Sequence, residues 1–256
     1  MIISVGDHIN LTMKEVELTL NSYTYPVFVN AQNERPDLIA SSVIVQIKNN
    51  IYLITALHVI DAVTKINSPF YIATDGYFIA IEGEFTRSIE KDRDDFDIAF
   101  IELDADFVSK NKLNVLDENK LMTNKSFDSV HLHLIHGYPC SKNKQGKSLK
   151  GTTNFKSYAF TYGGKVDKSF NKWQDFNKNK DFHTCMNYGI AKDINGDVNT
   201  PPSPRGISGG GLWLVPNSFK PNEIYLDAIF IEYYKKDKIS FSTKIEKVVE
   251  FIENNT

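Results

Sequence analysis

The feature that most limits what this chain can fold into is a series of short runs of β-branched and aromatic residues separated by turn-forming residues. The first two runs, 43–48 and 51–57, are joined by Asn49 and Asn50, which tolerate the positive backbone angles of a tight hairpin. Further runs of the same kind lie at 70–74, 77–85, 97–103, 130–139, 156–166, 211–216 and 223–234. Because strands and helices do not alternate, the pattern predicts an all-β fold of packed antiparallel sheets or barrels instead of a parallel α/β fold.

Residues 242–255 have a helical pattern instead. Four apolar residues recur there with helical period: Ile245, Val248, Val249 and Ile252. Thr243 and Glu246 have the spacing of a capping box, in which two side chains bond free amides at the start of a helix. We therefore predict one C-terminal α-helix, besides a short helical turn at 58–63. Residues 1–37 are polar and are interpreted as an N-terminal extension with a candidate strand at 25–30.

Composition excludes several classes of protein. The 256 residues are 41% hydrophobic and 24% charged, which suits a soluble chain with one large or two small domains. A net charge of -3 gives no general attraction to nucleic acid or to an acidic membrane surface. The chain starts without a basic segment followed by an apolar run, and its cysteines, Cys140 and Cys185, form no disulfide framework. We expect a cytoplasmic protein with no membrane and no nucleic-acid partner.

Two other patterns are interpreted as structural. His131 and His133 share one face of an expected strand, but a third ligand at that spacing would point away, so we predict no metal and no cofactor. The lysine-rich segments 141–150 and 171–182 are interpreted as solvated loops, because no ordered stripe of aromatic and basic residues accompanies them.

The segment 201–214 carries the strongest chemical signal. Ser208 lies in a turn among four glycines: Gly206, Gly209, Gly210 and Gly211. Glycine tolerates unusual backbone angles and leaves no side chain in the way, so such a turn can present the serine hydroxyl to a ligand. Ser208 is a candidate nucleophile; a loose surface turn is the alternative.

A serine nucleophile needs a base and a group that orients the base. His58 directly follows the apolar run 51–57, at a point where a rigid strand ends and a cleft can begin. Asp97 opens the apolar strand 98–101, whereas the acidic residues just before it suit a solvated loop. The order His58, Asp97, Ser208 is one of the known orders of the serine-hydrolase triad.

The motifs around these residues resemble those of the chymotrypsin-like (trypsin-like) serine proteases. The segment TALHVI is similar to their TAAH motif, DIAFIEL to their DIAL strand, and RGISGGGLW to their GDSGGPL turn. The strand LDAIFIEYY and the final ISFSTKIEKVVEFI also match the family pattern, so the resemblance covers about residues 38–254. The loops between the motifs match poorly.

The resemblance implies two six-stranded antiparallel β-barrels with the site between them. The first barrel, 38–120, would carry His58 and Asp97, and the second, 121–256, would carry Ser208 and the helix. His58 would act as general base and acid, Asp97 would orient it, and the amides of Gly206 and Ser208 would form the oxyanion hole.

Three departures from the family pattern affect the expected behaviour. Ile207 replaces the usual aspartate before the serine, so the salt bridge that activates secreted zymogens is not expected. Gly211 replaces a proline, and Ser42 stands where a glycine is usual. These departures suggest an intracellular or bacterial type of the family.

The resemblance also assigns a substrate pocket. Its expected residues are Pro202, Ile231, Glu232, Tyr233 and Ser240. Tyr233 stands where many relatives have glycine, which would narrow the pocket. No acidic floor for lysine or arginine is visible, so we expect a small or apolar side chain there.

The sequence therefore predicts a serine endopeptidase that acts on protein or peptide substrates through an acyl-enzyme. Three alternatives remain open: a catalytically silent protease-like module that binds proteins, a regulated effector protease in a bacterial stress or antiphage system, and an esterase for small molecules. A cytoplasmic protease would need restraint, either by a regulatory protein partner or by a misformed oxyanion turn.

Overall fold

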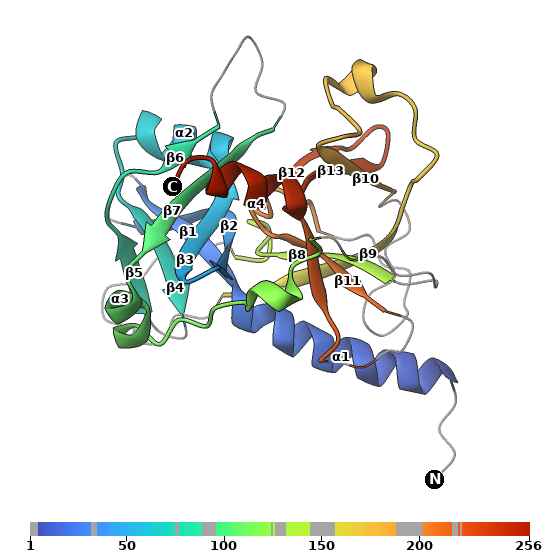
Figure 1. Ribbon diagram of the computed structural model, residues 1–256, viewed down its shortest axis with the longest axis horizontal. Coiled ribbons are helices and arrows are strands. Elements are labelled where there is room, and N and C mark those ends of the chain that lie inside the picture. The colour runs from blue at the N-terminus through green and yellow to red at the C-terminus, as the bar shows by residue number, and fades with distance from the viewer. Residues whose placement is uncertain are drawn as a thin grey trace.

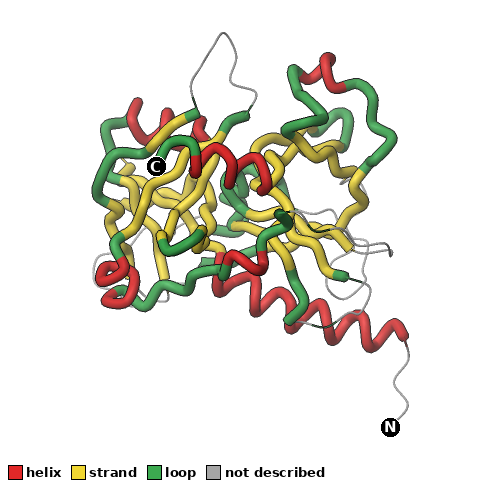
Figure 2. Tube along the Cα trace, viewed as in Figure 1, coloured by secondary structure: helices red, strands yellow, loops and turns green. Residues whose placement is uncertain are grey.

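Two antiparallel β-sheets lie side by side in the computed structural model, with a long helix along one side of them (Figure 1). The structure describes residues 5–31, 35–74, 77–88, 96–123, 125, 132–143, 157–187, 202–216, 220 and 222–256. Strands and loops make up most of the body, as Figure 2 shows. The predicted fold class, mostly β with antiparallel sheets, is therefore correct.

The first sheet contains seven strands in the order β5-β4-β1-β2-β3-β7-β6. Its strands are β1 (Thr24–Ala31), β2 (Arg35–Ile47), β3 (Asn50–Ala56), β4 (Phe70–Thr74), β5 (Tyr77–Ile81), β6 (Thr86–Arg87) and β7 (Ile98–Leu103). The predicted hairpin is present as β2 and β3, but its turn lies at Lys48 and Asn49, and Lys48 takes the positive φ of 55°. In the described residues the edge strands β5 and β6 do not pair with each other, so the predicted closed six-stranded barrel is wrong for this sheet.

The second sheet has the expected six strands. They are β8 (Leu132–Gly137), β9 (Phe160–Val166), β10 (His183–Asn187), β11 (Gly211–Val215), β12 (Tyr225–Tyr234) and β13 (Ile239–Lys244). They pair in the order β10-β13-β12-β11-β8-β9, and β9 returns to β10. That last contact consists of two residue pairs, Met186 with Val166 and Asn187 with Lys165, so the ring is closed by its shortest strand pairing.

The N-terminal region is more ordered than the sequence indicated. Helix α1 (Val5–Tyr23) packs Thr12, Val16 and Leu20 against the body and leaves Leu11 and Leu18 exposed. The candidate strand at 25–30 is β1, and it lies inside the first sheet between β2 and β4. Residues 1–37 are therefore not a separate extension, because the first sheet includes β1 and the start of β2.

Three shorter α-helices complete the described fold: α2 (Leu57–Lys65), α3 (Ala105–Lys110) and α4 (Ile245–Glu253). Helix α4 buries the four apolar residues that predicted it. The expected capping box is absent, however, since Lys244 is the N-cap residue and the Thr243 hydroxyl donates to Phe96 O at 2.7 Å.

One apolar core joins the two sheets. It runs from the first sheet through Leu116 and Leu121 in the connecting segment to Trp213 and Phe241 in the second. The connecting segment contains the 3-10 turn η1 (Glu118–Lys120), and a second one, η2 (Trp173–Phe176), lies between β9 and β10. Continuous packing fixes how the halves meet, which matters because the site draws on both. None of the described helices is long and apolar enough to span a bilayer.

Candidate active site

A cavity of about 560 Å³ lies where the two sheets meet. It contains His58 from α2, Asp97 from the residues just before β7, and Ser208 from the turn before β11. The other residues that line it are Leu57, Asp61, Lys178, Ser203, Pro204, Arg205, Phe230, Ile231, Glu232 and Tyr233. The three residues that the sequence singled out for catalysis therefore line one cavity.

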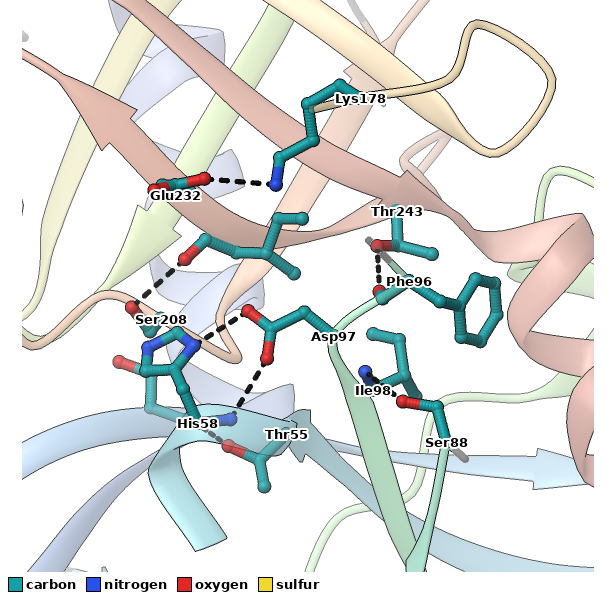
Figure 3. A network of polar contacts seen from close by, with 12 residues as sticks. Thr55, His58, Ser88, Phe96, Asp97, Ile98, Lys178, Ser208, Glu232 and Thr243 are labelled. Atoms are coloured by element: carbon teal, nitrogen blue, oxygen red, sulfur yellow. Dashed lines mark hydrogen bonds and ion pairs between the residues drawn. The ribbon is translucent and has the colours of Figure 1, made fainter. Parts of the chain in front are cut away.

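Asp97 holds His58 through both backbone and side chain. Asp97 Oδ2 lies 2.7 Å from His58 Nδ1, and Asp97 Oδ1 accepts the His58 backbone amide at 2.9 Å (Figure 3). The Asp97 carbonyl also accepts the Leu57 amide at 3.1 Å. Asp97 adopts a positive φ of 49°, a conformation that aspartate and asparagine tolerate better than most residues. The carboxylate thereby fixes the first turn of α2 and the orientation of the imidazole together.

Electrostatics favour the protonated form of His58. Burial alone would lower the pKa of His58, but the hydrogen bond and charge of Asp97, with smaller contributions from Glu232 and Asp61, raise it above its ordinary value of 6.5. A histidine whose charged form is stabilised in this way can accept a proton during a reaction and hold it.

Ser208 lies on the other side of the imidazole. Figure 3 shows its side chain beside the ring nitrogen that faces away from Asp97. Its hydroxyl donates to Ile231 O at 3.4 Å, and among the described contacts no hydrogen bond joins it to His58. The conformation described is therefore one in which serine and base are neighbours but not bonded.

Most backbone carbonyl groups of the turn around Ser208 accept a hydrogen bond. Three consecutive carbonyls accept hydrogen bonds: Arg205 O from Cys140 N (2.7 Å), Gly206 O from Ser41 Oγ (2.9 Å) and Ile207 O from Gly210 N (2.7 Å). The Ser208 carbonyl accepts the Ser41 amide at 2.9 Å. Such a turn has little freedom to rearrange.

Two amides of the same turn are left over. Within the described residues, the Gly206 and Ser208 amides donate to no backbone carbonyl, whereas Ile207 N reaches Pro204 O and Gly209 N reaches Phe230 O. In a trans peptide the C=O and the N–H point in opposite directions, so the bond from Cys140 to Arg205 O turns the Gly206 N–H away from Cys140. The two amides predicted to form the oxyanion hole are therefore those whose N–H groups are not used by a described backbone hydrogen bond.

Gly206 is required at its position. Its φ is 99°, and a Cβ there would lie 2.7 Å from Cys140 Sγ and 2.7 Å from Tyr138 O. A side chain would therefore both strain the backbone and push the Arg205–Gly206 peptide away from Cys140. Ile207 shares none of this strain: it is fully buried among Ile135 and other apolar residues, where a charged anchor would have no polar surroundings.

The expected substrate pocket is matched in part. Ile231, Glu232 and Tyr233 line the cavity, as predicted from the sequence. Pro202 and Ser240 are not among its lining residues: Pro202 O accepts the Tyr162 hydroxyl at 2.9 Å, and Ser240 is buried in β13. The specificity itself stays a prediction.

Lys178 contradicts the interpretation of 171–182 as a solvated loop. Its side chain is only 9% exposed, and its Nζ lies 3.0 Å from Glu232 Oε2 at the edge of the cavity (Figure 3). The paired Lys178 and Glu232 side chains therefore form part of the cavity wall, and Lys178 is largely shielded from solvent.

The remaining candidates do not add a second centre. His131 lies outside the described residues, while His133 faces Asp227 at 3.5 Å, an acidic neighbour that the sequence gave no reason to expect. In the described part of the chain no group of three or more His, Cys, Asp or Glu side chains is arranged to hold a metal. Both thiols are free, and burial raises the pKa of Cys140 and raises that of Cys185 to about 12, which leaves both as weak nucleophiles.

Comparisons with known proteins inform the fold. No protein-family model and no curated protein matches the chain. Among solved structures, it is similar to a Glu endopeptidase in complex with MPD, with 14% identity, a TM-score of 0.51 and coverage of 92% of this chain and 90% of the other. It is also similar to a chain from a study of how aromatic interactions drive the coupled folding and binding of the intrinsically disordered Sesbania mosaic virus VPg protein, with 15% identity, a TM-score of 0.50 and 90% coverage of both chains.

At such identities the likeness concerns the fold alone. The chain shares its overall fold with the Glu endopeptidase, and its two antiparallel sheets are consistent with the chymotrypsin-like fold that the sequence motifs imply. Activity and the roles of individual residues rest on the geometry of the cavity.

Sequence reasoning missed several residues that shape the site. Ser41 reaches the Ser208 turn from β2, whereas the family pattern points to its neighbour Ser42 as the serine in place of a glycine. Arg205 and Lys178 line the cavity from loops whose sequence carries no periodicity. The sequence contains one indirect signal for Ser41, namely that its neighbour Ser42 stands where the family usually has glycine.

Proposed function

We propose that the protein is a serine endopeptidase that hydrolyses peptide bonds in protein substrates through an acyl-enzyme. The observation that carries the proposal is the pairing of His58 with Asp97 at 2.7 Å in the cavity that also contains Ser208. The spare amides of Gly206 and Ser208 support it independently.

In the proposed reaction Ser208 Oγ attacks the carbonyl carbon of the substrate. His58 Nε2 removes the serine proton, and Asp97 stabilises the resulting imidazolium through Nδ1. The same proton then passes to the leaving amine as the C–N bond breaks. Water repeats the sequence on the acyl-enzyme, losing a proton to His58 and releasing the acid and Ser208.

The serine has to leave Ile231 O before it attacks. The 3.4 Å hydrogen bond to that carbonyl is long. Rotation about the Cα–Cβ bond of Ser208 would turn the hydroxyl toward the imidazole side of the cavity. The negative charge that develops on the substrate oxygen would be met by the Gly206 and Ser208 amides, each worth about 3 kcal/mol of transition-state stabilisation.

The proposed pocket takes a small or apolar side chain. Phe230, Ile231 and Tyr233 supply apolar surface in the cavity, which favours such a group over a charged one.

A fluorophosphonate probe tests the proposal directly. We expect the wild type to be labelled and Ser208→Ala to resist labelling. Ser203→Ala is the matched control, because Ser203 is an exposed serine that lines the same cavity, and this variant should be labelled like the wild type. Labelling that survives in Ser208→Ala, or that is absent from the wild type under all conditions, would contradict a serine-nucleophile enzyme.

A silent protease-like binding module is the second candidate. The hydrogen bond of Ser208 to Ile231 in place of His58, together with Tyr233 in the cavity, favours it. Such a module would bind a peptide equally well as wild type and as Ser208→Ala, and neither would release a cleaved product.

A further inference from the structure

Ser41 lies in β2 of the first sheet, and two of its four described hydrogen bonds go to the Ser208 turn. Its amide donates to Ser208 O at 2.9 Å, and its hydroxyl donates to Gly206 O at 2.9 Å. The same hydroxyl accepts the Tyr138 amide at 2.9 Å, while the Ser41 carbonyl accepts Thr55 Oγ1 at 2.9 Å. Ser41 is completely buried, so water cannot replace any of these bonds.

We propose that Ser41 is a positioning residue for the oxyanion turn. Its hydroxyl joins the Gly206–Ile207 peptide to the strand end at Tyr138 and so keeps the Gly206 and Ser208 amides directed at the same reacting oxygen. This inference rests on the proposed function, because it assigns a role in the same reaction.

The need for such a residue follows from the turn itself. The Gly206 N–H lies in the Arg205–Gly206 peptide plane, and the backbone angles of Gly206 set how that plane stands relative to the segment that carries the Ser208 N–H. Cys140 N fixes the plane before it through Arg205 O, and Ser41 Oγ fixes the plane after it through Gly206 O. Without the second bond, the Gly206–Ile207 peptide would keep one hydrogen bond among those described, from Ile207 N to Pro204 O.

The surroundings leave room for this hydroxyl and little else. A Cβ on Gly137 would lie 2.8 Å from Ser41 Oγ and 2.9 Å from Ile207 Cγ2. The serine hydroxyl can act as donor and acceptor at once, which is what Gly206 O and Tyr138 N require. A buried, apolar Ile207 offers no charged anchor for the turn, and a neutral hydroxyl bridge meets the same need without a buried charge.

Ser42 provides a matched control. It is the next residue, it is also completely buried, and its hydroxyl donates to Tyr25 O at 3.4 Å within the first sheet. Ser42→Ala therefore removes a buried hydroxyl of the same strand without touching the turn.

The kinetic experiment compares Ser41→Ala and Ser42→Ala on a chromogenic peptide substrate. For Ser41→Ala we expect kcat to fall by about tenfold to a hundredfold with KM nearly unchanged, because a displaced oxyanion donor weakens the transition state more than the bound substrate. For Ser42→Ala we expect kcat within about twofold of the wild type. Equal kcat values for the two variants would overturn the inference.

Hydrogen–deuterium exchange gives a reading that needs no activity. We expect the peptide that covers 205–210 to exchange faster in Ser41→Ala than in the wild type, while Ser42→Ala leaves it unchanged. If Ser41→Ala does not fold, Ser41→Cys keeps the size with a weaker donor and is used instead. Unchanged exchange at 205–210 in the folded variant overturns the inference. If the wild type neither reacts with the probe nor cleaves substrate, the proposed function fails, and the exchange result still decides whether Ser41 holds the turn.

Discussion

The two sides of the cavity are built in different ways. On the first side, His58 and Asp97 are side chains that bond directly to each other, with the His58 side chain 50% exposed and the Asp97 side chain 18% exposed. On the second side, Ser208 depends on a backbone turn whose carbonyls from Arg205 to Ser208 all accept hydrogen bonds, while the Gly206 and Ser208 amides have no described backbone partner. The first side therefore contributes charge that solvent can modulate, and the second contributes geometry that tolerates little substitution.

Asp97→Asn removes the negative charge on the first side and should have the largest effect on kcat. The amide keeps the size and tolerates the positive φ, but it cannot stabilise the imidazolium and favours the wrong tautomer of His58. We expect kcat to fall by about 10⁴-fold with the fold intact, measured by steady-state kinetics and circular dichroism.

Asp61→Asn is the control for that change. Asp61 also lines the cavity, but it is exposed and pairs with Arg87 at 3.1 Å. A loss of kcat comparable to that of Asp97→Asn would mean that general negative charge, and not the contact with His58, is what matters.

Gly206→Ala breaks the geometry of the second side. The added methyl would meet Cys140 Sγ and Tyr138 O at 2.7 Å, so the Gly206 amide should lose its direction. We expect a loss of about 10²- to 10³-fold in kcat, the size expected for one oxyanion donor. A variant that keeps wild-type kcat would remove Gly206 from the proposed oxyanion hole.

The pKa values of His136 and His58 are shifted in opposite directions, so acid should affect the protein differently through each of them. Burial lowers the pKa of His136 in β8 to about 3, with its Nδ1 bonded to Thr161 Oγ1 at 2.8 Å. Below pH 6.5 the unfolded chain binds a proton that folded His136 refuses, so the free energy of unfolding should fall as the pH drops toward 3. We expect His136→Gln to remove about 1.4 kcal/mol per pH unit of that slope, measured by denaturant unfolding from pH 6.5 to 4. Equal slopes in both proteins would contradict the shift.

His58 should show the smallest change. Because Asp97 holds its pKa above 6.5, the acidic limb of kcat/KM should have its midpoint above that value, with activity lost as His58 becomes protonated. Glu232→Gln removes a charge that raises this pKa and frees Lys178, so the midpoint should move down. Glu250→Gln, which removes a carboxylate paired with Lys247 on α4, should leave the midpoint unchanged.

The sequence was informative where pattern and local chemistry coincide. The apolar period of α4 and the β-branched and aromatic runs of β2 and β3 depend on local contacts, and the structure has these elements at the predicted places. His58, Asp97 and Ser208 could be selected because each stands at the boundary of such a run.

The remaining features depend on contacts between distant segments. Of the described apolar residues of α1, Val16 and Leu20 are fully buried beside a buried threonine, which gives a weak period. The burial of Lys178 depends on Glu232 in another strand, and the role of Ser41 depends on where the Ser208 turn lies in space. No local pattern encodes these pairings.

The bond from Thr243 to Phe96 O has a consequence for the order in which the site matures. Phe96 precedes Asp97, and Thr243 lies in β13, so the segment that carries the acid receives this support from a strand made long after it. On a growing chain His58 and Asp97 emerge before Ser208, and β13 follows all three. The proposed protease would therefore complete its site only after β13 has been made.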